Sequence, residues 1–125
     1  MKSILETSEA PAPIGPYSQA VLSGNTLYTS GQIAINPKSG DLILDSIEEE
    51  THQVMKNLKA VLSEAEMTFD HVIKSSIFIS DMDNFGRINE IYGQYFTRDF
   101  PARETVEVAR LPKDVNVEIS MIAVK

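Results

Sequence analysis

Four polar positions in this sequence stand in apolar or conformationally constrained surroundings. Arg103 follows a Phe-Pro-Ala segment, and Glu118 lies between a valine and an isoleucine. Tyr17 follows a Gly-Pro pair, and Ser30-Gly31 comes at the end of a β-prone run. A guanidinium can bind a carboxylate through two parallel hydrogen bonds, and a positioned carboxyl group can carry a proton. Together these residue types could bind a small acid and move a proton on it.

A structural role remains open at each of these positions. Arg103 could pair with one of the 18 acidic residues, Glu118 could face water, and Ser30-Gly31 could form a β-bulge. No phosphate-binding glycine loop, G-x-S-x-G elbow or H-E-x-x-H motif accompanies them. The motifs of the common enzyme classes therefore do not decide the function.

The composition excludes several kinds of chemistry. The 125 residues include no cysteine, so disulfides, thiolate nucleophiles and Cys-ligated metal centres are excluded. The two histidines, His52 and His71, are too few to build a metal site, and we expect none. The formal net charge of −7 argues against nucleic acid or an anionic membrane as a partner. Apolar runs are short and the first residues include acids, so we expect one cytoplasmic domain spanning residues 1–125.

The first half of the chain predicts a β-hairpin followed by a long helix. Strand-like runs over residues 17–22 and 26–29 flank a Ser-Gly-Asn turn. Ser46 and Glu49 form a capping box, and apolar residues then recur at helical spacing, which predicts a helix over residues 46–65. The three consecutive acids at 48–50 are expected to form a solvated cap on its first turn.

The second half predicts a strand over residues 72–79, a helix over 85–96 with a core-facing aromatic stripe, and strands over 104–109 and 115–124. This order indicates an α+β fold with two helices on one face of a sheet. Two helices cannot cover both faces, yet Ile122 and Val124 make the second face of the last strand apolar. We therefore expect another copy of the chain to cover that face.

Four segments of the chain resemble the RidA (YjgF) family of reactive intermediate deaminases, and the match runs almost end to end. They are Ala-Pro-Ala-Pro-Ile-Gly-Pro-Tyr-Ser-Gln at 10–19, Thr-Ser-Gly-Gln-Ile at 29–33, Pro-Ala-Arg-Glu-Thr-Val-Glu-Val-Ala-Arg-Leu-Pro-Lys-Asp at 101–114, and Val-Glu-Ile at 117–119. The most specific feature is an arginine after Pro-Ala combined with a glutamate in the final strand.

The resemblance implies a chorismate-mutase-like fold with a mixed sheet, three subunits around a central β-barrel, and active clefts between neighbouring subunits. It also implies a cofactor-independent reaction. Family members hydrolyse 2-imino acids such as 2-iminobutanoate and 2-iminopropanoate, and their enamine tautomers, to 2-oxo acids and ammonia. These substrates are released by pyridoxal-phosphate dehydratases. The expected partners are a small imino or oxo acid and two further copies of this chain.

The resemblance also implies a role for each matching position. Arg103 would hold the substrate carboxylate and Glu118 would handle the water proton. The pocket would be completed by the backbone of Thr105 and by the side chains or backbone of Tyr17, Ser30, Gly31, Phe85 and Asn89. Thr105 stands where many members carry cysteine, and Glu104 stands where a small residue is usual. Strand alternation predicts that Glu104 points away from Arg103 and Thr105.

Two other functions compete with imine hydrolysis. A non-catalytic module could use the same Arg103 pocket to bind 2-oxo acids or related metabolites without turnover. Glu118 discriminates against it, because a pocket for an anion gains nothing from a second negative charge. A ribonuclease ranks last, because the chain has a net charge of −7 and no basic patch.

Overall fold

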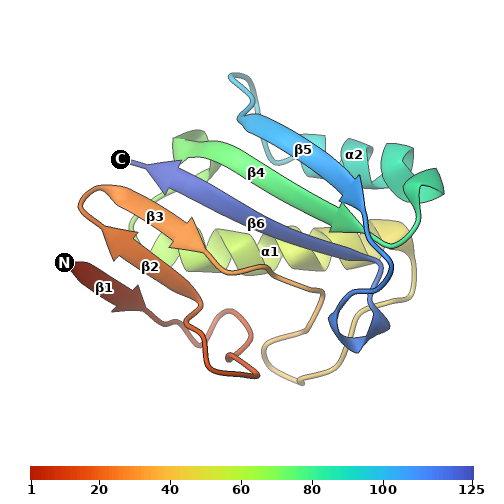
Figure 1. Ribbon diagram of the computed structural model, residues 1–125, viewed down its shortest axis with the longest axis horizontal. Coiled ribbons are helices and arrows are strands. Elements are labelled where there is room, and N and C mark those ends of the chain that lie inside the picture. Colours follow the sequence, from red (N-terminus) through yellow and green to blue (C-terminus); the bar gives the residue numbers. More distant parts are fainter.

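The computed structural model describes residues 1–125 and places two helices behind a mixed six-stranded sheet (Figure 1). The strands are β1 (Lys2–Leu5), β2 (Ala20–Ser23), β3 (Thr26–Thr29), β4 (Val72–Ile79), β5 (Ala102–Glu107) and β6 (Val117–Val124). The helices are α1 (Ile47–Glu64) and α2 (Phe85–Gly93), with short 3-10 turns at Phe69–His71, Met82–Asn84 and Pro112–Asp114. The predicted α+β class, with both helices on one sheet face, is confirmed.

The last strand of the chain lies inside the sheet. The strand order is β1-β2-β3-β6-β4-β5, so β6 pairs with β3 on one side and β4 on the other. All pairings are antiparallel except β4 with β5, which are parallel and joined through α2. Consequently β4 separates β6, which carries Glu118, from β5, which carries Arg103.

The helix α1 begins as the sequence predicts. Ser46 is its N-cap and accepts a hydrogen bond from the Glu49 backbone N–H at 3.1 Å, which satisfies one of the first free amides. Its apolar face packs in the core against alternate side chains of β6: Val117, Ile119, Met121 and Ala123. Neither helix has the combination of length and apolar character that crossing a bilayer needs.

The predicted hairpin is formed by β2 and β3. Ser23 pairs with Thr26, and Gly24 in the turn has φ +61°, a backbone conformation that glycine adopts without a steric penalty. The predicted strand over 17–22 starts only at Ala20, because the Tyr17 N–H bonds to the Gly15 carbonyl at 2.9 Å in a turn.

Several other expected boundaries are wrong by a few residues, and one strand was not predicted. The edge strand β1 has three exposed side chains out of four, so no alternating pattern marks it. The helix α2 ends at Gly93 instead of 96, and β5 spans Ala102–Glu107 instead of 104–109. The last strand begins at Val117 instead of 115, because the Asn116 N–H bonds to the Glu50 side chain. Glu50 itself is fully buried, so the predicted solvated cap is wrong for this acid.

The second face of the sheet carries apolar side chains. Tyr28 and Ile122 pair across β3 and β6 on this face, and Val106 lies on it in β5. Tyr28 remains 50% exposed and Val106 41% exposed. Phe78 is partly covered by a small cluster around Leu111. This face is the one for which the sequence predicts a partner.

Candidate active site

The structure separates the predicted site residues into two groups on opposite faces of the sheet. Thr105 pairs with the buried Ile77 beneath the helices, and Arg103 lies two residues earlier on the same side of β5. Glu118 instead pairs with Phe78, which points to the other face. We call the first group the arginine half-site (Arg103, Thr105, Phe85 and Asn89). We call the second the glutamate half-site (Glu118, Tyr17, Ser30 and Gly31).

In the arginine half-site, the guanidinium of Arg103 is held without being neutralised. Its Nη1 donates a hydrogen bond to Oδ1 of Asn89 at 2.6 Å. Its central carbon lies 5.2 Å from the Tyr92 ring centroid and 5.7 Å from that of Phe85, at cation–π range. The four ion pairs of the chain involve other residues. The alternative in which Arg103 pairs with an acid of its own chain is therefore wrong.

Glu104 points to the opposite face from Arg103, which confirms the prediction from strand alternation. Its carboxylate accepts a hydrogen bond from Ser76 and lies 2.9 Å from the Lys74 ammonium. These hydrogen bonds, from Ser76 first and then Lys74, lower the pKa of Glu104. The negative charge of Glu104 is therefore paired with Lys74 on the second face and does not neutralise Arg103.

The helix α2 supplies the other side chains around Arg103. Phe85, Asn89 and Tyr92 recur at intervals of four and three residues, so they share one face of α2. The Tyr92 hydroxyl donates a hydrogen bond to Oγ of the buried Ser75 at 2.8 Å, and burial raises the pKa of Tyr92. Sequence reasoning assigned Tyr92 to the core only. Its helical spacing from Asn89 was the signal that could have placed it beside Arg103.

Two features complete the environment of the arginine half-site. The hydroxyl oxygen of Thr105 is buried and has no hydrogen-bond partner. Phe85, at the start of α2, is 38% exposed. Of the other rings of the aromatic stripe, Tyr92 and Phe96 are buried and Tyr95 packs partly buried against the core. The predicted core role of this stripe therefore holds for these three rings but not for Phe85.

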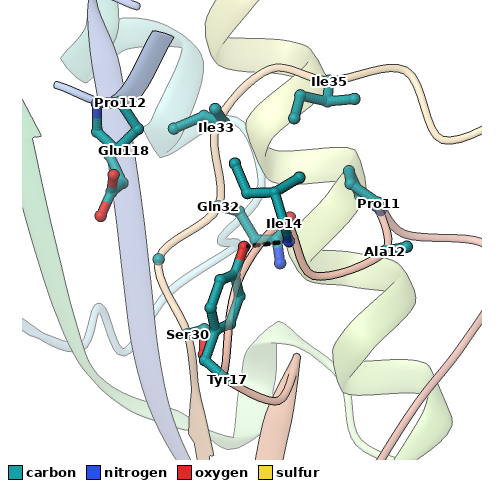
Figure 2. Close-up of a pocket in the computed structure, with 11 residues that line it drawn as sticks. Pro11, Ala12, Ile14, Tyr17, Ser30, Gln32, Ile33, Ile35, Pro112 and Glu118 are labelled. Atoms are coloured by element: carbon teal, nitrogen blue, oxygen red, sulfur yellow. Dashed lines mark hydrogen bonds between the residues drawn. The ribbon is translucent and has the colours of Figure 1, made fainter. Parts of the chain in front are cut away.

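The glutamate half-site lines a cavity of about 400 Å³ on the other side of the sheet (Figure 2). Glu118 projects from β6, while Tyr17 and Ile14 come from the proline-rich segment. The hydroxyl of Tyr17 accepts a hydrogen bond from the Ile14 N–H at 3.2 Å, which folds this segment back over the cavity. The Ser30 hydroxyl donates to the Ser18 carbonyl at 2.5 Å. The walls are thus largely apolar, with few polar groups.

Gly31 allows the close approach of Glu118. A Cβ atom at position 31 would lie 2.8 Å from the carboxyl carbon of Glu118 and closer still to one of its oxygens. The next residue, Gln32, exchanges two backbone hydrogen bonds with Ile119 at 2.8 and 3.1 Å. The glycine therefore lets the β6 side chain lie directly against the neighbouring backbone.

The Glu118 carboxyl is half-buried and has no cationic partner within its own chain. Burial raises its pKa above the usual value for glutamate. The alternative in which Glu118 faces water therefore holds only for the half of the side chain that borders the cavity. A carboxyl group with a raised pKa in a largely apolar cavity is suited to accepting and returning a proton.

The two histidines lie outside both half-sites. Nδ1 of His52 is 2.8 Å from the Tyr95 hydroxyl, and Nδ1 of His71 accepts the Thr68 backbone N–H at 2.9 Å in a capping box. No three His, Asp or Glu side chains of the chain converge in a way that could hold a metal ion. Both histidines therefore have local structural contacts that account for them.

Known proteins resemble this chain over nearly its whole length. Residues 7–125 match the family described as Endoribonuclease L-PSP. A RutC family protein of Pyrococcus horikoshii is 48% identical over all of this chain and 99% of its own. A human protein named 2-iminobutanoate/2-iminopropanoate deaminase is 42% identical over all of this chain and 91% of its own.

Solved structures share the fold over the whole chain. The Rid family protein YyfA of Yersinia pestis superposes with a TM-score of 0.97, is 51% identical, and all of both chains is covered. TdcF of E. coli, solved with bound serine, superposes with a TM-score of 0.95 and is 40% identical over 98% of each chain. The chain therefore belongs to the Endoribonuclease L-PSP family, as its resemblance to the RidA (YjgF) proteins predicts.

Proposed function

We propose that this protein hydrolyses 2-imino acids, and their enamine tautomers, to 2-oxo acids and ammonia. The site combines the arginine half-site of one subunit with the glutamate half-site of its neighbour in a homotrimer. The observation that carries the proposal is the guanidinium of Arg103, held by Asn89 but not neutralised, together with the half-buried Glu118. The deaminase name of the human relative and the serine bound to TdcF support an amino-acid-like substrate.

Arg103 binds the substrate carboxylate in this proposal. Its planar fork can donate two parallel hydrogen bonds, while Asn89 and the rings of Phe85 and Tyr92 fix the plane of the guanidinium. The carbon of the adjacent C=N bond is then held in one place. Holding the reacting carbon in this way lowers the entropic part of the barrier to attack by water.

Glu118 handles the protons of the reaction. Its carboxylate accepts a proton from water as the water oxygen bonds to the C=N carbon, and the electron pair of the C=N bond passes to nitrogen, which is protonated. The resulting tetrahedral intermediate carries one hydroxyl and one amino group. Its C–N bond breaks as the C=O bond forms and the hydroxyl proton passes, through the Glu118 carboxylate, to the amino nitrogen, which leaves as ammonia. The raised pKa of Glu118 suits both taking up the proton and returning it to nitrogen.

The arrangement of the sheet supports a site that is shared with a second subunit. Arg103 and Glu118 project from opposite faces of one chain, with β4 between their strands. A second copy that covers the apolar face around Tyr28 and Ile122 would bury that surface and bring a foreign β5 edge towards Glu118. The same contact thus serves assembly and catalysis in the proposal.

A coupled assay tests the reaction. A pyridoxal-phosphate threonine dehydratase generates 2-iminobutanoate, and the rate of 2-oxobutanoate appearance is compared with and without this protein. We expect acceleration by the wild type and none by Arg103→Ala. Full activity in Arg103→Ala would contradict the enzyme assignment. No acceleration, with calorimetric binding of 2-oxobutanoate that depends on Arg103, would identify a binding module.

A further inference from the structure

A buried carboxylate outside both half-sites contacts the beginning of β6. Glu50, in the first turns of α1, is fully buried. Its Oε2 accepts hydrogen bonds from the backbone N–H of Asn116 at 2.8 Å and of Val117 at 3.2 Å, and its Oε1 accepts one from Nδ2 of Asn116 at 2.7 Å. A carboxylate without water needs such donors, so these three contacts hold it in place.

These contacts fix the strand directly before Glu118. Val117 immediately precedes Glu118, and the carbonyl of Asn116 also accepts the Ser80 N–H at 3.1 Å. Immediately after Glu118, Ile119 is held by its two backbone hydrogen bonds to Gln32. The backbone on each side of the candidate proton carrier is therefore anchored by a separate group.

The carboxyl of Glu118 packs against Gly31 on one side and borders the cavity on the other. The contact with Gly31 is so close that a methyl group there would overlap the carboxyl. Close-packed contacts resist small movements, and a misplacement of about 1 Å of a reacting group can cost on the order of 100-fold in rate. A side chain that sets the position of the β6 backbone thus sets the position of the Glu118 carboxyl.

We propose that Glu50 is a positioning residue for Glu118: through Asn116 and Val117 it fixes the start of β6 and so places the Glu118 carboxyl against Gly31. Its effect on rate rests on the proposed function, whereas its effect on position does not. The role depends on where the acceptor oxygens lie. It does not depend on the negative charge of Glu50.

Two substitutions separate position from charge. Glu50→Gln removes the charge but keeps the side-chain length and one acceptor oxygen for the backbone N–H groups. The Asn116 amide can rotate so that its oxygen accepts a hydrogen bond from the new NH2 group. Glu50→Asp keeps the charge and withdraws the oxygens by one methylene. In the coupled assay we expect Glu50→Gln to stay within about twofold of the wild type, and Glu50→Asp to lose about tenfold or more in kcat with little change in KM.

A second measurement follows position independently of activity. The amide resonance of Gly31, observed by NMR in the intact oligomer, is expected to shift in Glu50→Asp and to stay in place in Glu50→Gln. Asn116→Ala weakens the same contact from the strand side and is expected to shift this resonance in the same direction. The control is Thr51→Val on the same helix turn, which removes the buried hydroxyl that donates to the Ile47 carbonyl at 2.7 Å and leaves β6 untouched.

The outcomes are distinguishable. An unchanged kcat and an unmoved Gly31 resonance in folded Glu50→Asp would overturn the proposal. A loss in Glu50→Gln that exceeds the loss in Glu50→Asp would overturn it in favour of charge. Equal losses in Glu50→Gln and Glu50→Asp, or an equal loss in Thr51→Val, would overturn it in favour of general stability. If the wild type hydrolyses no imine but the Gly31 resonance moves only in Glu50→Asp and Asn116→Ala, the positioning role stands and the proposed function fails.

Discussion

The two half-sites are built in different ways. The arginine half-site stands on regular elements: Arg103 and Thr105 alternate along β5, and Phe85 and Asn89 are one helical turn apart on α2. The glutamate half-site stands mostly on irregular backbone, with only Glu118 on a strand. Its walls come from the proline-rich segment and from the loop that follows β3.

The irregular walls are held by individual buried amides. Nε2 of Gln19 donates to the Pro11 carbonyl at 2.9 Å, and Nδ2 of Asn57 donates to the carbonyls of Ile33 and Ile35 at 3.1 and 3.0 Å. Both amide side chains are almost fully buried. Periodic elements thus position the proposed carboxylate-binding group, whereas single hydrogen bonds hold the walls around the proposed proton carrier. Substitutions in the first half-site should act mainly on binding, and those in the second mainly on kcat.

The largest effect is expected at Glu118. Glu118→Gln keeps the shape of the side chain but cannot carry a proton, so kcat should fall about 100-fold or more while 2-oxo acid binding, measured by calorimetry, is retained. Full activity in this variant would shift the water-handling role to backbone groups near Thr105.

The raised pKa of Glu118 sets the pH dependence of both rate and stability. In the enzyme–substrate complex, where the substrate carboxylate neutralises Arg103, kcat should fall as pH drops through a pKa above the usual glutamate value. Because burial favours the protonated form of Glu118, this form contributes to the free energy of unfolding. The contribution is fully present below the pKa that Glu118 has in the unfolded chain, and it is lost as pH rises through the higher pKa of the folded protein. Glu118→Gln should therefore raise the Tm at neutral pH and not in acid. A lower Tm at neutral pH would contradict the burial argument.

The next largest effect is expected at Arg103. Arg103→Lys keeps a positive charge but loses the planar fork and the stacking on Phe85 and Tyr92. A lost charged contact in a desolvated cleft costs about 2 to 5 kcal/mol, so kcat/KM should fall well over tenfold in the coupled assay. Rescue by lysine to within about twofold would show that charge alone suffices.

A smaller loss is expected at Gly31. Gly31→Ala places a methyl group where the Glu118 carboxyl lies, so the carboxyl or the Gly31 backbone must move. We expect kcat to fall about tenfold while the affinity for 2-oxo acid changes little. Gly24→Ala in the β2–β3 turn is the control: its new methyl group meets no neighbour within 4 Å, although φ +61° strains it. It should lower Tm and leave kcat unchanged.

The smallest effect is expected outside both half-sites. Arg87 on α2 forms two hydrogen bonds with Glu48 on α1, at 2.8 and 2.7 Å, and they lower the Glu48 pKa to about 2. The stabilisation of the fold by this pair is present above the pKa that Glu48 has in the unfolded chain, and it is lost as pH falls towards 2. Since the pair is solvent-exposed, Arg87→Ala should lower Tm only slightly at neutral pH, by an amount that shrinks in acid, with kcat unchanged. A large loss of activity would mean that α2 positions Asn89 through this pair.

The regular elements could be predicted from the sequence because their signals are local. The capping box and apolar spacing located α1 to within a residue, and the β-branched run located β4. The start of β6 could not be predicted, because the Asn116 N–H is taken by Glu50 from a distant helix. The same contact buries Glu50, which the charge pattern of the helix predicts to be solvent-exposed.

The sequence names the candidate site residues but does not contain their arrangement. Strand alternation placed Arg103 and Thr105 together and Glu104 opposite. Alternation along the last strand places Glu118 on the second face with Ile122 and Val124, but the residues that lie beside it depend on the register of β6 against its neighbours, which is a long-range property that no local pattern contains. The close approach of Glu118 to Gly31 depends on the same register.

The central claim, that Arg103 and Glu118 of different subunits form one site, is tested most directly by mixing two inactive variants. Arg103→Ala and Glu118→Gln are refolded or co-expressed together, and native mass spectrometry verifies that mixed trimers form. A site shared between subunits regains both groups at one of the three interfaces of every mixed trimer, so an equal mixture should recover about a quarter of the wild-type rate. No recovery, with mixed trimers present, would show that each site lies within one chain and would contradict the account.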